Sequence, residues 1–176
     1  INVAGQSFEQ VRAMLVQRIS EQFIGVDSAI SMGNLRTIQV FVMGDAYRPG
    51  AYNVNALTTV TQALQIAGGI DTVGSLRKVQ VKRAGEVIQN VDLYKMLIWG
   101  NTEQDIRLRA GDTIFIPAKG TEVTIDGLVR RPGIYELSGP TGLNNVLALA
   151  GGLKAEALRE VTVTRRGQNG MQVFNL

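Results

Sequence analysis

The side chains that could support catalysis in this chain are carboxylates. The sequence contains no histidine and no cysteine, which excludes an imidazole base, a thiolate nucleophile and metal ligation by those residues. Asp112 lies in a predicted turn and Glu136 follows a predicted hairpin turn, and two carboxyl groups can hydrolyse a glycosidic bond. No spacing holds such a pair at catalytic separation, and aspartate is a common turn former. We therefore expect local turn roles, no catalytic residue and no enzyme activity.

Metal, cofactor and nucleic-acid sites are also not predicted. Asp45 and Asp126 flank two glycines at the ends of predicted strands and could bind Ca²⁺, but no acidic ladder with ligand spacing surrounds them. The net charge is +3, from 18 basic and 15 acidic residues, and the basic residues are scattered. A clustered basic footprint for nucleic acid is therefore missing from the sequence.

Arg48, Arg130 and Arg131 are the candidates for contact with a glycan or a protein partner. The guanidinium fork suits the carboxylates of acidic sugars. Arg48 and Arg131 each precede a Pro-Gly pair directly. Turn geometry explains the Pro-Gly pattern without a ligand, and a solvated arginine is the favoured interpretation. The adjacent Arg130 and Arg131 are better candidates than Arg48 because two cations meet there.

Aromatic side chains could stack on sugar rings, and the candidates are Trp99, Tyr47, Tyr52 and Tyr135. Tyr52 and Tyr135 occupy equivalent places in an internal repeat. This repeated placement favours packing within a hairpin over ligand binding.

The internal repeat has an offset of 83 residues, as from Gly44 to Gly127. Four blocks recur in the same order, which indicates a duplicated module. The matched pairs are residues 44–52 with 127–135, Leu64 with Leu147, 67–69 with 150–152, and 77–83 with 159–165 at offset 82.

The Arg-Pro-Gly sequence of each copy predicts a type II turn between two strands. In the first copy, a strand at residues 38–42 precedes the turn and a strand at residues 51–54 follows it. Proline fixes φ at the second position of the turn and glycine takes the positive φ of the third. Pro49 and Gly50 hold these positions in the first copy; Pro132 and Gly133 hold them in the second.

A short helix follows each hairpin. Thr59 and Gln62 have the spacing of a capping box, whereas the repeat favours Thr58, which aligns with Thr141, as the first residue. The Ala-Gly-Gly sequence after the helix predicts a left-handed end. Its glycines are Gly68 and Gly69, then Gly151 and Gly152. Because these glycines close a helix instead of opening one, they are not a phosphate cradle.

Strands are predicted at residues 79–83 and 87–93, joined at residues 84–85. A turn at Gly111 and Asp112 precedes a closing strand at residues 113–117. Together these elements predict an α+β module in which a small mixed sheet grips one helix. The second copy has no counterpart of residues 108–117. We expect the native chain to continue, with the second module incomplete here or completed by a neighbour.

The first 37 residues differ from the repeats and predict the end of a preceding domain. Ser7 and Gln10 form a capping box before an apolar-striped helix of about four turns. A strand is expected at residues 29–32, turning at residues 33–34 into a strand at residues 35–43. The chain starts at Ile1, which we interpret as a fragment or a processed product.

These motifs resemble the soluble-ligand-binding β-grasp (SLBB) modules of bacterial polysaccharide export outer-membrane proteins of the Wza type. The resemblance rests on Arg-Pro-Gly-Ala-Tyr at 48–52, Ala-Gly-Gly at 67–69, the Val-x-Val-x-Arg strand at 79–83 and Leu-x-x-Gly-Asp at 108–112. It implies tandem β-grasp-like modules preceded by the helix-strand tail of a polysaccharide export domain. The expected domains are residues 1–37 for the tail, 38–120 for the first module and 121–176 for the incomplete second module.

The resemblance also implies a non-catalytic function. A protein of this kind is expected in the periplasm and outer membrane of a Gram-negative bacterium, as a ring-forming component of a translocon that exports capsular polysaccharide or exopolysaccharide. Its implied partners are copies of itself, an inner-membrane polysaccharide co-polymerase and the exported polymer, with membrane contact only through segments absent from this sequence. The alternative is a soluble β-grasp module that binds a glycan or another small ligand.

Overall fold

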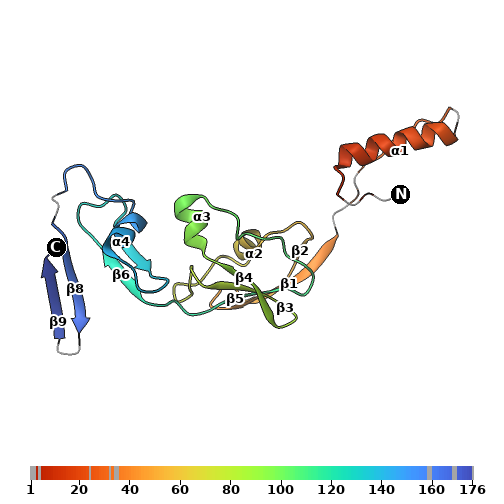
Figure 1. The fold of residues 1–176 in the computed structure, drawn as a ribbon. Coiled ribbons are helices and arrows are strands. Elements are labelled where there is room, and N and C mark those ends of the chain that lie inside the picture. The colour runs from red at the N-terminus through yellow and green to blue at the C-terminus, as the bar shows by residue number, and fades with distance from the viewer. Residues whose placement is uncertain are drawn as a thin grey trace. The chain divides into compact units, whose positions relative to one another are not determined.

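The computed structural model describes residues 3, 5–23, 25–31, 33, 36–157, 160–167 and 170–175. Residues Ile1–Arg36 and Thr37–Leu176 form two separate compact units (Figure 1). No helix among the described residues has the length and apolar character needed to cross a bilayer.

The first unit contains helix α1, Phe8–Gln22. The predicted capping box is confirmed: the Gln10 N–H donates to Ser7 Oγ at 3.4 Å, and the Ser7 N–H donates to Gln10 Oε1 at 2.9 Å. None of the residues of α1 is fully buried. Residues 26–31 have no regular secondary structure, so the expected strand at 29–32 is wrong over residues 29–31. Met32, Asn34 and Leu35 of the expected strand and turn lie outside the described residues.

The first module is a five-stranded mixed sheet, as predicted. Its strands are β1 (Thr37–Gly44), β2 (Gly50–Asn55), β3 (Val79–Arg83), β4 (Glu86–Val91) and β5 (Thr113–Ile116). Their order in the sheet is β2-β1-β5-β3-β4. The central strand β5 runs parallel to β1 and antiparallel to β3. It therefore joins the two hairpins of the module into one sheet.

One face of this sheet packs on the helix α2, Val60–Ile66, to form the core of the first module. Alternation along β1 buries Ile38, Val40 and Val42 while their neighbours face out. The fully buried members of the core are Val40, Val42, Val60, Ala63, Ala67, Val79, Val81, Ile114 and Ile116.

Helix α2 begins after Thr59, not after Thr58 as the repeat alignment favoured. Gln62 Oε1 accepts a hydrogen bond of 3.1 Å from the Thr59 N–H, as the capping-box spacing predicted. Thr58 is instead buried, and its carbonyl accepts from the Leu108 N–H at 2.9 Å. The aligned Thr141 also precedes the N-cap, which is Gly142. Thr58 and Thr141 are thus equivalent positions, but neither is the cap.

Helix α3, Leu93–Trp99, was not predicted from the sequence. Strand β4 ends at Val91 instead of Leu93, because the Asp92 carboxylate accepts from the Tyr94 N–H at 3.0 Å and caps a helix. Gly100, at φ +70°, ends that helix in the left-handed conformation. The signal for α3 was present as an N-cap aspartate and a C-terminal glycine.

The prediction of a type II turn with positive φ at Gly50 and Gly133 is wrong. Gly50 begins β2 and pairs with Val42, and φ is not positive at either glycine. The positive φ occurs at Gly44, +82°, where a Cβ atom would overlap the Ile116 carbonyl. Gly127, the repeat equivalent of Gly44, has φ +89°. The chain therefore turns where β1 ends beside β5, and the Arg-Pro-Gly residues complete a longer loop.

The second module repeats the elements of the first in the same order, up to its last hairpin. They are β6 (Glu122–Ile125), β7 (Gly133–Glu136), α4 (Leu143–Leu149), β8 (Thr162–Gly167) and β9 (Gly170–Asn175). Strands β6 and β7 form one two-stranded sheet, and β8 and β9 form another. Among the described residues no strand joins these two hairpins, unlike β5 in the first module.

Candidate functional site

The helix ends of the two modules have the same geometry. At the end of α2, the Gly69 N–H donates to the Leu64 carbonyl at 2.8 Å and the Gly68 N–H donates to the Gln65 carbonyl at 3.0 Å. Both glycines have positive φ, which is the Schellman arrangement. In α4 the same pair of bonds runs from Gly152 to Leu147 at 2.9 Å and from Gly151 to Ala148 at 3.0 Å. The left-handed helix end predicted from Ala-Gly-Gly is thus confirmed in both copies.

The Arg-Pro-Gly loop of the first module docks on this helix end through its backbone. The Arg48 N–H donates to the Ala67 carbonyl at 3.1 Å, and the Tyr47 N–H donates to the Gly69 carbonyl at 3.1 Å. The second module has the equivalent bonds, from Arg131 to Ala150 at 2.9 Å and from Arg130 to Gly152 at 3.0 Å. The two motifs singled out in the sequence therefore form one structural joint.

A tyrosine hydroxyl bonds the Arg-Pro-Gly loop in both copies. The Tyr52 hydroxyl donates to the Arg48 carbonyl at 2.6 Å, and the Tyr135 hydroxyl donates to the Arg131 carbonyl at 2.6 Å. Both hydroxyls therefore bond within their own hairpin, which agrees with the structural role predicted from their repeated placement.

The arginine side chains of the joint lie at the surface. Arg48, Arg130 and Arg131 are all exposed. One guanidinium nitrogen of Arg131, Nη2, lies 3.3 Å from the Leu149 carbonyl at the end of α4. A cation there is favourable, because it faces the negative end of the helix dipole and carbonyls without helical partners. Since a guanidinium carries five N–H donors, this contact leaves others for a ligand.

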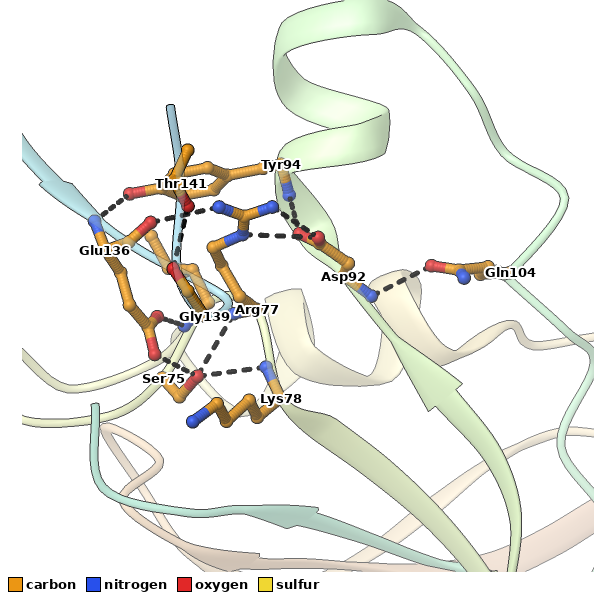
Figure 2. Close-up of polar contacts among 10 residues, drawn as sticks. Ser75, Arg77, Lys78, Asp92, Tyr94, Gln104, Glu136, Gly139 and Thr141 are labelled. Carbon is orange, nitrogen blue, oxygen red and sulfur yellow. Dashed lines mark hydrogen bonds and ion pairs between the residues drawn. The ribbon is translucent and has the colours of Figure 1, made fainter. Parts of the chain in front are cut away.

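A polar cluster joins the two modules, and it was not predicted from the sequence. The Glu136 side chain, at the end of β7, is 4% exposed. Its carboxylate accepts hydrogen bonds from the Ser75 hydroxyl at 2.7 Å, the Leu76 N–H at 3.0 Å and the Gly120 N–H at 3.0 Å. Figure 2 shows this carboxylate directly beside Ser75. A side chain of the second module thereby satisfies donors of the first module and of the connection between them.

Arg77 ties the same junction to the start of α3. Its Nε and Nη2 lie 3.2 and 3.0 Å from Asp92 Oδ2, and its Nη1 donates to the Glu136 carbonyl at 3.1 Å. In Figure 2 the guanidinium lies between Asp92 and Glu136. The Arg77 and Asp92 side chains are only 10% and 14% exposed, so this ion pair is much less screened than a surface pair.

Tyr94 completes the junction. Its hydroxyl accepts from the Glu136 N–H at 3.0 Å, and its ring packs edge-on against Tyr135 with centroids 6.4 Å apart. The Arg77 guanidinium lies 5.0 Å from the centroid of the Tyr94 ring, within range of a cation–π interaction. Charged, aromatic and backbone groups thus hold β7 against the first module.

The Ser75–Glu136 pair has no features of an activated nucleophile. The Ser75 hydroxyl oxygen also accepts from the N–H groups of Arg77 at 3.1 Å and Lys78 at 2.9 Å. One donor and two acceptor positions of the hydroxyl are therefore used. With its three bonds, the Glu136 carboxylate is likewise held by the fold. The arrangement is suited to fixing two modules together.

Asp112 anchors Arg83 in the first module. The aspartate side chain has no exposed surface, and its two oxygens accept from Arg83 Nε and Nη2, each at 2.8 Å. The Arg109 N–H adds a third bond of 2.8 Å, which is the turn role expected of Asp112. Burial alone would raise the pKa of Asp112, but the hydrogen bonds from Arg83 and Arg109 outweigh it, so the pKa is lowered.

The other candidate residues do not converge. Tyr47 and Trp99 are 65% and 54% exposed. Asp126 bonds its own neighbour, the Gly127 N–H, at 2.7 Å. Over the described ranges, no three acidic side chains gather in a way that could hold a metal ion.

One feature of the sequence pointed toward the junction, namely that the second copy differs from the first at Glu136. Glu136 aligns with Asn53, which is exposed in the first module. A carboxylate that replaces a neutral residue at the end of a short strand marks a position with a role specific to one copy. Neither Ser75 nor Tyr94 shows a pattern in the sequence that identifies its partner.

Comparison with known proteins shows what the two modules resemble. Residues 38–116 and residues 123–174 each match an SLBB domain. Two Escherichia coli proteins, both described as polysialic acid transport protein KpsD, are 29% and 28% identical to this chain over 129 residues. The aligned part covers 72% of this chain and 23% of each relative, so the match spans about a quarter of the length of these relatives.

Proposed function

We propose that this chain, which matches two SLBB domains in tandem, forms the periplasmic part of an outer-membrane translocon component that exports capsular polysaccharide or exopolysaccharide. The observation that carries this proposal is the similarity to two polysialic acid transport proteins over 129 residues, which is 72% of this chain. In this proposal residues 1–37 are the tail of a polysaccharide export domain, 38–120 the first module and 121–176 the second.

The junction between the modules supports a role in assembly. Glu136, Arg77 and Tyr94 hold the two modules together through buried or nearly buried polar groups. A fixed pair of modules presents the same surface in every copy, which a closed ring of identical subunits requires. We infer that copies of the protein form such a ring, and that its partners are an inner-membrane polysaccharide co-polymerase and the exported polymer.

We infer a non-catalytic role for both modules. Three buried polar side chains, Ser75, Asp112 and Glu136, are each engaged by several hydrogen bonds within the fold. These bonds orient the groups toward the protein and not toward a substrate.

The test of export uses a strain in which the gene is deleted and the complete protein is restored from a plasmid. We expect the deletion to remove most polysaccharide from the cell surface, with polymer retained inside the envelope, and the restored protein to reverse this. Unchanged surface polysaccharide would refute the proposal. The ring is tested separately, by light scattering on the complete protein extracted from the envelope in detergent. We expect a closed oligomer; a monomer would shift support to a soluble glycan-binding module.

A binding experiment tests direct contact between this protein and the exported polymer. We propose that Arg48, Arg130 and Arg131 contact an acidic polysaccharide, because they are exposed and two of them occupy equivalent joints. The probes are polysialic acid and, as the matched uncharged control, dextran, titrated against the chain. Replacing the three arginines by glutamine should weaken polysialic acid binding and leave the fold intact, since the joint is built from backbone N–H groups. Equal binding of both polymers would refute this contact.

A further inference from the structure

The backbone just after β6 contains a pair of residues that can react with each other. Asp126 is followed directly by Gly127, and this is the one Asp-Gly pair in the sequence. A carboxyl carbon can be attacked by the backbone nitrogen of the next residue, and a glycine there has no side chain to obstruct the approach. Each of the other aspartates is followed by a residue that has a side chain.

The structure holds the two reacting groups in contact. Asp126 Oδ1 lies 2.7 Å from the Gly127 nitrogen and accepts its N–H. Because Oδ1 is bonded to the carboxyl carbon, that carbon also lies close to the nitrogen, and such proximity favours reaction between two groups. The carboxylates of three other aspartates are bonded to N–H groups that do not belong to the following residue, namely those of Asp92, Asp105 and Asp112.

Water reaches this pair, as a reaction that ends in hydrolysis requires. Asp126 and Gly127 are both exposed. In the first module the equivalent residues are Met43 and Gly44, which are also exposed although β5 pairs alongside them. Exposure is therefore a property of this position within the module.

We propose that Asp126 and Gly127 form a cyclic imide that opens to isoaspartate. The Gly127 nitrogen forms a bond to the side-chain carboxyl carbon of Asp126. One carboxyl oxygen leaves as water, together with the amide hydrogen and the carboxyl hydrogen. A second water then adds to the main-chain carbonyl carbon of Asp126 and breaks the bond from that carbon to the nitrogen. One water leaves and one enters, so the reaction needs no oxidant and no cofactor.

The rearrangement loosens the joint of the second module. The main chain now runs through the side-chain carbons of the aspartate and is one carbon atom longer. The residues that follow are held in place: Val129 is 2% exposed, the Lys154 N–H donates to the Leu128 carbonyl at 2.9 Å, and the Arg130 N–H donates to the Gly152 carbonyl at 3.0 Å. An extra atom so close to these bonds shifts their donors and acceptors apart.

The two modules therefore differ in how they age. The first module has methionine in place of the aspartate, so its joint keeps the original backbone. This inference rests on local chemistry and stands independently of polysaccharide export.

The test uses the folded 176-residue chain, kept for weeks in water labelled with heavy oxygen and then digested with trypsin in ordinary water. Trypsin releases residues 120–130, which contain Asp126 and no other aspartate or asparagine. We expect a second form of this peptide that carries one heavy oxygen, and electron-transfer fragmentation should identify it as isoaspartate. The Asn-Gly pair at residues 169–170 falls in a different tryptic peptide, 167–176, so its deamidation does not interfere.

Two controls and a structural measurement complete the test. Asp126→Glu keeps the charge but would have to close a larger ring, so the second form of the peptide should be lost. This variant is expected to fold, because the Asp126 side chain is exposed. The exposed Asp71, which precedes Thr72, should stay unlabelled. In the aged chain, amide hydrogen exchange should become faster over residues 127–135 and stay the same over residues 44–52.

Three results would overturn the proposal. The first is labelling of a free synthetic peptide of residues 120–130 but not of the folded chain, because the fold would then protect the pair. The second is equal labelling at Asp71 and Asp126, because contact with a glycine nitrogen would then not matter. The third is unchanged hydrogen exchange over residues 127–135 in the isomerised chain, because the joint would then tolerate the longer backbone.

Discussion

The Ser75 hydroxyl donates a hydrogen bond of 2.7 Å to the carboxylate of Glu136, which lies 61 residues further along the chain. This bond crosses from the first module to the second, and both residues are buried. Each module has its own hydrophobic core cluster, and no shared cluster spans the junction. The stability of the junction therefore depends on polar groups, which makes it sensitive to single substitutions.

Replacing Glu136 with alanine should lower the free energy of unfolding by about 2–4 kcal/mol, because buried donors at Ser75, Leu76 and Gly120 lose their acceptor. Urea unfolding followed by circular dichroism measures the change. Glu122→Ala is the matched control: Glu122 lies opposite Glu136 in the strand pair, and its partner is a surface lysine. We expect a cost below about 1 kcal/mol there. Equal costs for the two variants would contradict a structural role for Glu136.

Stability should fall in acid through Asp112. Its pKa is lowered in the folded chain, so above the ordinary carboxyl pKa of about 3.9 the ionised form contributes its full stabilisation. This contribution is lost as the pH falls through the lower, folded value. Asp112→Asn should remove that part of the acid dependence, and so should Arg83→Gln. Urea midpoints measured between pH 2 and pH 6 test this; a variant with the acid dependence of the parent chain would contradict it.

Gly68 and Gly69 should respond differently to alanine. Both have positive φ, of +85° and +92°, so either substitution costs about 1–2 kcal/mol in backbone strain. A Cβ atom on Gly68 would also lie 2.8 Å from Tyr47 Cδ1, whereas nothing lies within 4 Å of one on Gly69. Gly68→Ala should therefore lower the melting temperature more than Gly69→Ala does. The reverse order would show that the loop does not pack against the helix end.

Removing the Tyr135 hydroxyl should destabilise the second module slightly. Tyr135→Phe loses the 2.6 Å bond to the Arg131 carbonyl, which is worth about 0.5–1.5 kcal/mol. Tyr47→Phe is the matched control, because the Tyr47 side chain is 65% exposed, and its effect should stay within about 0.5 kcal/mol. Thermal unfolding of both variants provides the comparison. An equal loss for Tyr47 would contradict the assigned role of the Tyr135 hydroxyl.

Features that depend on neighbours in the chain were predictable from the sequence. The capping box at Ser7 and Gln10 and the left-handed helix ends at Gly68 and Gly151 are settled within a few residues. The repeat supported the α+β fold, and the motifs in their order along the chain resembled a known family. Tyr52 and Tyr135 could be assigned to packing for the same reason.

Features that depend on distant residues were decided by the tertiary structure. The Arg-Pro-Gly loop is not the predicted type II turn, because its N–H groups bond a helix end about 20 residues away and Gly50 pairs within the sheet. Thr58 is drawn into the core instead of capping α2. Local propensity is worth only a few tenths of a kcal/mol to about 1 kcal/mol per residue, so such contacts override it.

The junction between the modules shows most clearly what could not be predicted from the sequence. Nothing in the sequence pairs Ser75 with Glu136, or Arg83 with Asp112, since each partner becomes a neighbour only when strands from separate parts of the chain assemble. The sequence alone determined that two related modules exist. Only the structure showed that the carboxylate of Glu136 is buried against donors at Ser75 and Leu76, because that contact depends on how the two modules pack.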